Sequence, residues 1–139
     1  MSDKASMDFA GQSLGGVLSG VVEEKGAKLG RVILQKTTML ILRETVKNTR
    51  VDTGALRNNW QVSRNLRNRS KDTGSSSKTG QQAISDGRRK VKNIRLTDIV
   101  FIQNNLEYAS HWERVDKMLK ESVRKVTANL EKNLDKTRL

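Results

Sequence analysis

The sequence predicts an α+β domain with a long N-terminal helix, a small antiparallel sheet and a long C-terminal helix. A long polar loop and a short helix are expected to separate the two strands of the sheet. Three observations support this. Residues 21–48 are rich in helix formers and contain no proline, residues 98–105 are β-branched and aromatic, and an apolar stripe at helical spacing follows Ser110. At 139 residues, the chain is expected to form a single domain over 21–139, after a flexible arm over 1–20.

The N-terminal arm is rich in glycine, serine and alanine and shows no sustained period, so we expect it to be mobile or to be ordered by a partner. The helix after it has apolar residues nearly all round its centre, at "TMLIL". Such a helix must be covered on several sides. Four basic side chains nonetheless fall in one narrow band of the helical wheel and form a ridge: Lys25, Lys36, Arg43 and Lys47.

A first strand is predicted after a corner at residues 51–54, because Leu56, Trp60 and Val62 alternate with polar residues. Residues 65–81 are polar and rich in serine, and we expect a mobile loop or an arm that folds on a partner. A short basic helix over 82–94 and a second strand over 98–105 follow.

The final helix is predicted to run over residues 110–136 as one element of roughly 40 Å. Ser110 and Glu113 match a capping box, which would start this helix. Its apolar stripe consists of Trp112, Val115, Leu119, Val123, Val126, Leu130 and Leu134.

Most catalytic chemistry is excluded by the residue inventory. The chain has no cysteine and one histidine, His111, and it carries no metal-ligand spacing and no glycine-rich phosphate loop. The triplet Asp52-Thr53-Gly54 matches that of aspartic proteases, but those enzymes need two such carboxylates among strands, whereas a helix precedes Asp52 here. We therefore expect Asp52 and Thr53 to fold a corner and Gly54 to adopt a positive φ. The chain is not expected to be an enzyme or to bind a cofactor.

The formal charge of +12 favours contact with a polyanion, although a solubilising surface would give the same excess. The longest compact apolar run is far shorter than the ~20 residues of a membrane span. We expect no membrane contact and synthesis in a cytosol.

Two segments, "VDTGALRNNW" and "DIVFIQNNLEYASHWE", together resemble the HK97 gp10-like family of tailed-phage head–tail connection and tail completion proteins. The resemblance spans about residues 29–113. The first motif is matched by Val51, Asp52, Thr53, Gly54, Leu56, Arg57 and Trp60, and the second by Asn104, Asn105, Tyr108, Ala109 and Glu113. We expect these residues to hold the fold, with the Tyr108 ring buried and Glu113 capping its own helix near Arg57 or Arg114. The family often continues with Gly and a Pro-Gly segment, which this chain lacks.

The resemblance implies a structural virion protein of a tailed bacteriophage, assembled in the host cytoplasm as a sixfold or twelvefold ring. The ring would lie in the neck or at the top of the tail and would contact itself, the portal or adaptor, and the tail terminator or tail tube. Viral DNA would pass through it, and basic side chains facing the lumen would contact phosphates without reading sequence. Candidates are Arg64, Arg67, Arg69, Lys71, Lys78, Arg88, Arg89, Lys90 and Lys92, for which a solvated surface or an acidic protein partner is an equal interpretation.

A second hypothesis is a free-standing, sequence-nonspecific nucleic-acid-binding module, which the charge alone motivates. The chain has no aromatic stacking platform, recognition-helix motif or zinc site that would support this hypothesis further.

Overall fold

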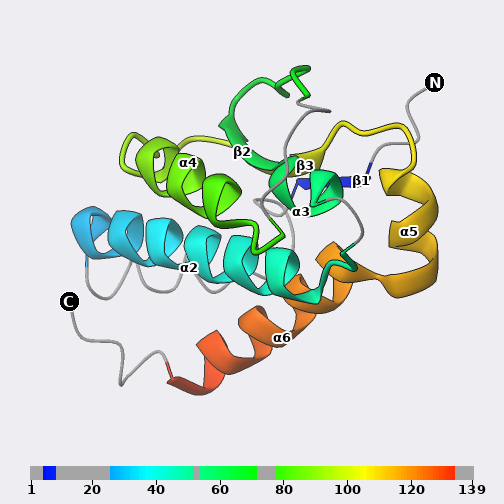
Figure 1. Ribbon diagram of the computed structural model, residues 1–139. Helices are drawn as coiled ribbons and strands as arrows, with labels where there is room; N and C mark the ends of the chain where they lie inside the picture. Colours follow the sequence, from blue (N-terminus) through cyan, green and yellow to red (C-terminus); the bar gives the residue numbers. More distant parts are fainter. Residues whose placement is uncertain (1–4, 9–25, 52–53, 72–77, 134–139) are drawn as a thin grey trace.

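The computed structural model describes residues 5–8, 26–51, 54–71 and 78–133. Its elements are β1 (Ala5–Asp8), α2 (Ala27–Asn48), α3 (Ala55–Asn58), β2 (Trp60–Arg64), α4 (Gln81–Val91), β3 (Val100–Asn104), α5 (Ala109–Asp116) and α6 (Met118–Asn133). The predicted α+β class is confirmed. The helices α2, α4 and α6 lie along one side of the sheet, and α5 lies at the opposite end from α4 (Figure 1).

The sheet is antiparallel with the order β1-β3-β2, so β3 is the central strand. Trp60 pairs with Asn104 and Val62 with Ile102, which places these four residues on the face that packs on the helices. No strand was predicted at residues 5–8, yet Ala5–Asp8 pairs with β3. The rest of the predicted arm lies outside the described residues.

Helix α2 is the centre of the core. It packs against α4, α6 and β2, and its residues Ile41 and Leu42 are fully buried (Figure 1). The prediction that this helix is covered on several sides is therefore confirmed. Two of its buried threonines satisfy their hydroxyls within the helix: Thr38 donates to the carbonyl of Leu34 at 2.8 Å, and Thr45 donates to that of Ile41 at 2.7 Å.

Helix α4 packs on α2 at Gly87. A Cβ built on Gly87 of α4 would lie 2.2 Å from Leu42 Cδ2, so a larger residue there would force the buried Leu42 side chain to shift.

The prediction of one continuous C-terminal helix is wrong. The helix breaks at Lys117, which adopts a left-handed conformation with φ 52°, and α5 ends there while α6 begins at Met118. The apolar stripe is divided accordingly: Leu119 is buried against the body, whereas Val115 is 56% exposed. Residues 134–136 of the predicted helix lie outside the described residues.

The first predicted strand is shorter than expected, because Leu56 belongs to the single turn α3 and the strand starts at Trp60. This turn buries Leu56 and lets the chain change direction before β2 begins.

The described part of the predicted mobile loop, residues 65–71, folds across the outer face of the sheet. Gln61 donates to the carbonyl of Ser70 at 2.7 Å, and Asn105 donates to the carbonyl of Asn68 at 2.7 Å. Gln103 also donates to the carbonyl of Asn68. These buried and half-buried amides satisfy one another and the loop backbone, so this segment is ordered by the chain itself. Residues 72–77 lie outside the described part.

Candidate structural and interaction sites

The corner that follows α2 has the backbone that the sequence predicted. Gly54 has φ 89° and ψ −8°, which is the left-handed region, and its carbonyl accepts the N–H of Asn58 at 3.0 Å. Glycine is the residue that adopts this conformation without steric cost. Asp52 and Thr53 lie outside the described residues, and Val51 is 40% exposed.

Arg57 holds the end of α2. Its Nε donates to the carbonyl of Thr49 at 2.8 Å, and its Nη2 donates to the carbonyl of Lys47 at 3.1 Å. Its Nη1 donates to the carbonyl of Lys78, ahead of α4, at 2.9 Å. Carbonyls at a helix C-terminus lack partners within the helix, and a cation there also complements the helix dipole. One guanidinium therefore joins the end of α2 to the start of α4.

Trp60 and Asn104 are paired residues of β2 and β3 that bond to the corner from inside the core. The Trp60 indole, 1% exposed, donates to the Thr49 hydroxyl at 2.8 Å. The fully buried amide of Asn104 donates to the carbonyl of Leu56 at 2.7 Å and accepts the N–H of Leu106 at 3.2 Å. Both residues are thus fully engaged in holding the fold.

The second motif divides into two kinds of residue. Ala109 is fully buried, but the expected burial of the Tyr108 ring is wrong, because Tyr108 is 45% exposed. Tyr108 occupies the N-cap position of α5, and no side chain caps this helix in the part of the chain that the structure describes.

The capping box of Ser110 and Glu113 is therefore also wrong. Glu113 caps the following helix: its carboxylate oxygens accept the N–H groups of Leu119 and Lys120, each at 3.0 Å. The Glu113 carboxylate therefore binds the start of α6 and not, as was expected, Arg57 or Arg114. The reason is that the break at Lys117 turns the first N–H groups of α6 toward Glu113.

An ion pair connects α5 to the end of α2. Arg50 donates to both carboxylate oxygens of Asp116, at 2.8 and 2.9 Å, and its guanidinium lies 3.5 Å from the centroid of the Trp112 ring. The hydrogen bond from Arg50 lowers the pKa of Asp116 and raises the pKa of Arg50. No sequence pattern predicted this cluster, because Arg50 and Asp116 lie 66 positions apart in the chain.

Asp98 is a second residue that sequence reasoning missed. Burial acts to raise its pKa, but hydrogen bonds from the Arg95 N–H and from the Asn65 and Arg64 side chains outweigh it and leave the pKa lowered. Asp98 therefore fastens the start of β3 to the end of β2. Asp98 is the first residue of the predicted strand, and this position is the only signal that could have drawn attention to it.

The predicted basic residues in and beside the loop are partly engaged by the fold. Arg64 donates to the carbonyl of Asn93 at 2.8 Å and lies 3.4 Å from Asp98. The Arg67 guanidinium lies 5.2 Å from the centroid of the Phe101 ring. The Lys71 ammonium lies 3.6 Å from Glu107. Arg69 and Lys78 are exposed.

The predicted basic residues of α4 and its end lie mostly at the surface. Arg88, Arg89 and Lys92 are exposed, and Arg89 is paired with Asp86 at 2.6 Å. Lys90 is half-buried, and it lines the same pocket as Arg64. The structure therefore brings together, at this pocket, Arg64 from the predicted loop group and Lys90 from the predicted group after the loop. Of the predicted α2 ridge, Lys36, Arg43 and Lys47 are exposed, and Lys25 lies outside the described residues.

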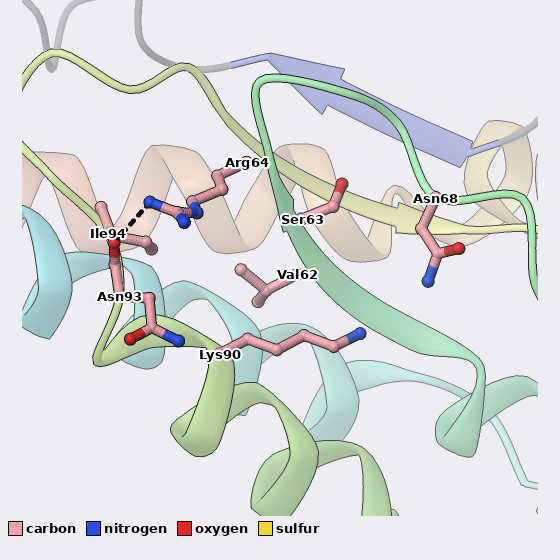
Figure 2. A pocket seen from close by; sticks show the side chains of 7 residues that line it. All are labelled: Val62, Ser63, Arg64, Asn68, Lys90, Asn93 and Ile94. Atoms are coloured by element: carbon pink, nitrogen blue, oxygen red, sulfur yellow. Dashed lines mark hydrogen bonds between the residues drawn. The ribbon is translucent and has the colours of Figure 1, made fainter.

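The pocket between β2 and α4 has a volume of about 260 Å³. It is lined by Val62, Ser63, Arg64, Asn68, Lys90, Asn93 and Ile94 (Figure 2). Val62 and Ile94 are buried and form an apolar floor, and the polar and charged side chains surround it. This volume is smaller than the ~300–1,000 Å³ of pockets for drug-sized ligands.

Among the described residues, no three carboxylate or imidazole groups gather as they would around a metal ion. Within the same ranges, none of the helices is long and apolar enough to cross a bilayer. His111 lies at the surface of α5, with its ring edge-on to Trp112 at a centroid distance of 4.6 Å.

The fold and its motif residues define a structural α+β scaffold, in which the polar groups of Arg57, Trp60, Asn104 and Glu113 bond to their own chain. Comparison with known families agrees with this class. The model of the family described as "Bacteriophage HK97-gp10, putative tail-component" matches residues 18–113, which is more than half of the chain. The chain belongs to this family and is a structural component of a bacteriophage tail, as the resemblance predicted. The searches of curated proteins and of solved structures gave no match.

Proposed function

We propose that the chain forms a ring of six or twelve identical subunits in the phage neck or at the top of the tail. The ring joins the head connector to the tail and surrounds the channel through which viral DNA passes. Its neighbours are the portal or adaptor on one side and the tail terminator or tail tube on the other. The observation that carries this proposal is the family match over residues 18–113, which includes both motifs.

The arrangement of the motif residues supports a role that depends on surfaces. Arg57, Trp60 and Asn104 are occupied by contacts within the subunit, so they are not available for contact with a partner. A subunit of a ring needs a rigid body that presents two different adhesive faces. The exposed side of α5 and the basic surface beside α4 are two such faces.

The basic residues support contact with DNA in the channel. Arg88 and Lys92 are exposed on or just after α4, and long flexible cations of this kind bind backbone phosphates irrespective of sequence. Such contact suits a channel through which every part of a genome must pass.

The proposal is tested by deleting the gene from the phage and examining the lysate by electron microscopy. We expect free heads beside free tails, and complementation in trans with the full chain should restore joined virions. Mass spectrometry of purified wild-type particles should find the polypeptide. Normal virions from the deletion strain would refute the proposal.

Binding to short duplex DNA separates this proposal from the free-standing nucleic-acid-binding module. The proposed ring subunit should bind a short duplex weakly in isolation. Tight binding by an isolated monomer, falling steeply with salt, together with absence from particles, would favour the module.

A further inference from the structure

Helix α5 carries a row of exposed and half-buried side chains, mostly aromatic, which we call the aromatic stripe: Tyr108, His111, Trp112 and Val115. Spacings of three and four residues place them along one side of the helix. Of all the residues of α5, only Ala109 is buried. Tyr108 is 45% and Val115 is 56% exposed, so the two ends of the stripe face away from the core.

The stripe is held in a fixed orientation. Arg50 covers one face of Trp112 at 3.5 Å and binds Asp116, while Glu113 ties α5 to the first turn of α6. Tyrosine, tryptophan and arginine are also the residues enriched where protein interfaces gain most of their binding energy. Trp112 itself packs on the core, so the part of this rigid helix face that is exposed for docking consists of Tyr108, His111 and Val115.

The β2–α4 pocket has the complementary form. Its buried floor of Val62 and Ile94 is apolar, and Lys90 extends along it from α4 toward Asn68, with Asn93 at its edge (Figure 2). At about 260 Å³ it has room for a side chain. A phenol ring can lie on the apolar floor while its hydroxyl accepts a hydrogen bond from the Lys90 ammonium.

The two features lie at opposite ends of the subunit, with α4 on the left and α5 at the right edge of Figure 1. Their charges are also complementary. Glu107, next to Tyr108, has a side chain that is 90% exposed and lies 3.6 Å from the Lys71 ammonium, whereas Arg64 and Lys90 line the pocket. The carboxylate beside the stripe is therefore opposite in charge to the basic residues of the pocket.

We propose that the aromatic stripe of one subunit docks on the β2–α4 pocket of the next copy of this chain, with the Tyr108 ring entering the pocket and Glu107 facing its basic edge. Because the two patches differ and lie at opposite ends, this contact is head-to-tail, and repetition closes a ring when the rotation between neighbours permits. The inference rests on the proposed function and assigns the surface through which the ring forms.

Engineered disulfides test this contact directly, because the chain has no cysteine of its own. Full-length Tyr108→Cys and Asn93→Cys proteins are purified separately, mixed at high concentration and oxidised. We expect a disulfide-linked dimer in the mixture and none in either variant alone. Leu40→Cys replaces a residue of α2 that is 49% exposed, and its mixture with Asn93→Cys is the matched control, which should give no adduct.

Charge reversal gives a second test. Glu107→Lys should weaken self-association measured by light scattering, and combination with Lys90→Glu in the same chain should restore it in part, because the Lys90 ammonium also donates to the Tyr108 hydroxyl. Circular dichroism confirms that each variant is folded. Equal self-association in all of them would contradict the inference.

The outcomes separate the inference from the proposed function. Assembly into rings without the 108–93 disulfide would overturn the assigned contact and leave the ring intact. A disulfide formed by Tyr108→Cys alone would replace it with a twofold contact. A chain that stays monomeric without any adduct would also overturn it, whereas the deletion phenotype tests the proposed function independently.

Discussion

The two motif regions of this subunit use their residues in opposite ways. At the corner after α2, Arg57 and Trp60 are bonded to the body and Leu56 is buried. At α5, Tyr108 and Val115 are about half exposed, and the helix is tethered chiefly through Arg50 and Glu113. The first region explains how the chain folds, and the second supplies a surface that folding leaves unused. The motif residues therefore divide into those that build the subunit and those that stay exposed on its surface.

The largest effect should follow removal of the buried Trp60 indole, which bonds to the corner. Trp60→Ala leaves a cavity beside β3 and should lower the free energy of unfolding by about 3–5 kcal/mol, measured by chemical denaturation. Trp60→Phe keeps most of the ring and loses the bond to Thr49, so it should cost less. Equal losses in both variants would mean that packing of the ring matters little.

The backbone of the corner provides the next largest effect. Gly54→Val places a β-branched residue at φ 89° and should cost about 1–3 kcal/mol, visible as a lower Tm. Gly26→Val is a useful comparison for backbone strain without crowding. Gly26 also has a positive φ, of 93°, but a Cβ added there would have no atom within 4 Å. An unchanged Tm in Gly54→Val would contradict the left-handed corner.

The joint between α5 and α6 should respond more mildly. Glu113→Gln keeps the shape of the side chain but removes the charge that caps α6, so we expect a loss of roughly 0.5–1 kcal/mol. Glu107→Gln removes an exposed carboxylate without a capping role and serves as the control. A larger loss in the control would show that Glu113 does not carry the cap.

The ion pair between Arg50 and Asp116 gives a pH dependence of known sign. Because Arg50 holds the pKa of Asp116 below its ordinary value, the pair stabilises the fold above that ordinary pKa, which is about 3.9. This contribution is lost as the pH falls through the lowered pKa of the folded state. Denaturation of the wild type and Asp116→Asn across acidic pH should show their difference in stability shrinking, and a constant difference would contradict the pair.

The smallest effect on the subunit itself should come from the aromatic stripe. Tyr108→Ala should change the unfolding free energy of the monomer by no more than about 0.5 kcal/mol, because the ring is half exposed. This variant sharpens the comparison between buried and exposed motif residues. Tyr108 belongs to the same motif as the buried Asn104 and Ala109, yet it would be unimportant to folding. A loss as large as that of Trp60→Ala would place Tyr108 with the corner residues instead.

The sequence predicted the features that depend on local patterns. Alternation at Trp60 and Val62 and the β-branched run at Val100 and Ile102 identify strands, and an αL glycine at position 54 follows from the turn composition. The apolar centre of α2 also indicated cover on several sides.

The features that failed depend on distant contacts. The stripe from Trp112 to Leu130 has the same period whether the helix is continuous or broken, and the bonds of Glu113 to Leu119 and Lys120 accompany the break. Strand β1 has no strand-like composition, and β3 provides its hydrogen-bond partners. The carbonyl of Lys78, which Arg57 binds together with those of Lys47 and Thr49, is likewise brought to the end of α2 only by the tertiary fold.

The left-handed residue at Lys117 has a geometric consequence for any closed assembly built through α5. Together with the contacts of Arg50 and Glu113, this joint sets the direction in which α5 leaves the body of the subunit. Around a ring, a small change in that direction is added once for every copy, so the number of subunits needed for closure depends on it. Lys117→Gly would relax this angle without changing Tyr108 or Val115, and if α5 forms the contact between copies, altered ring sizes would be its signature.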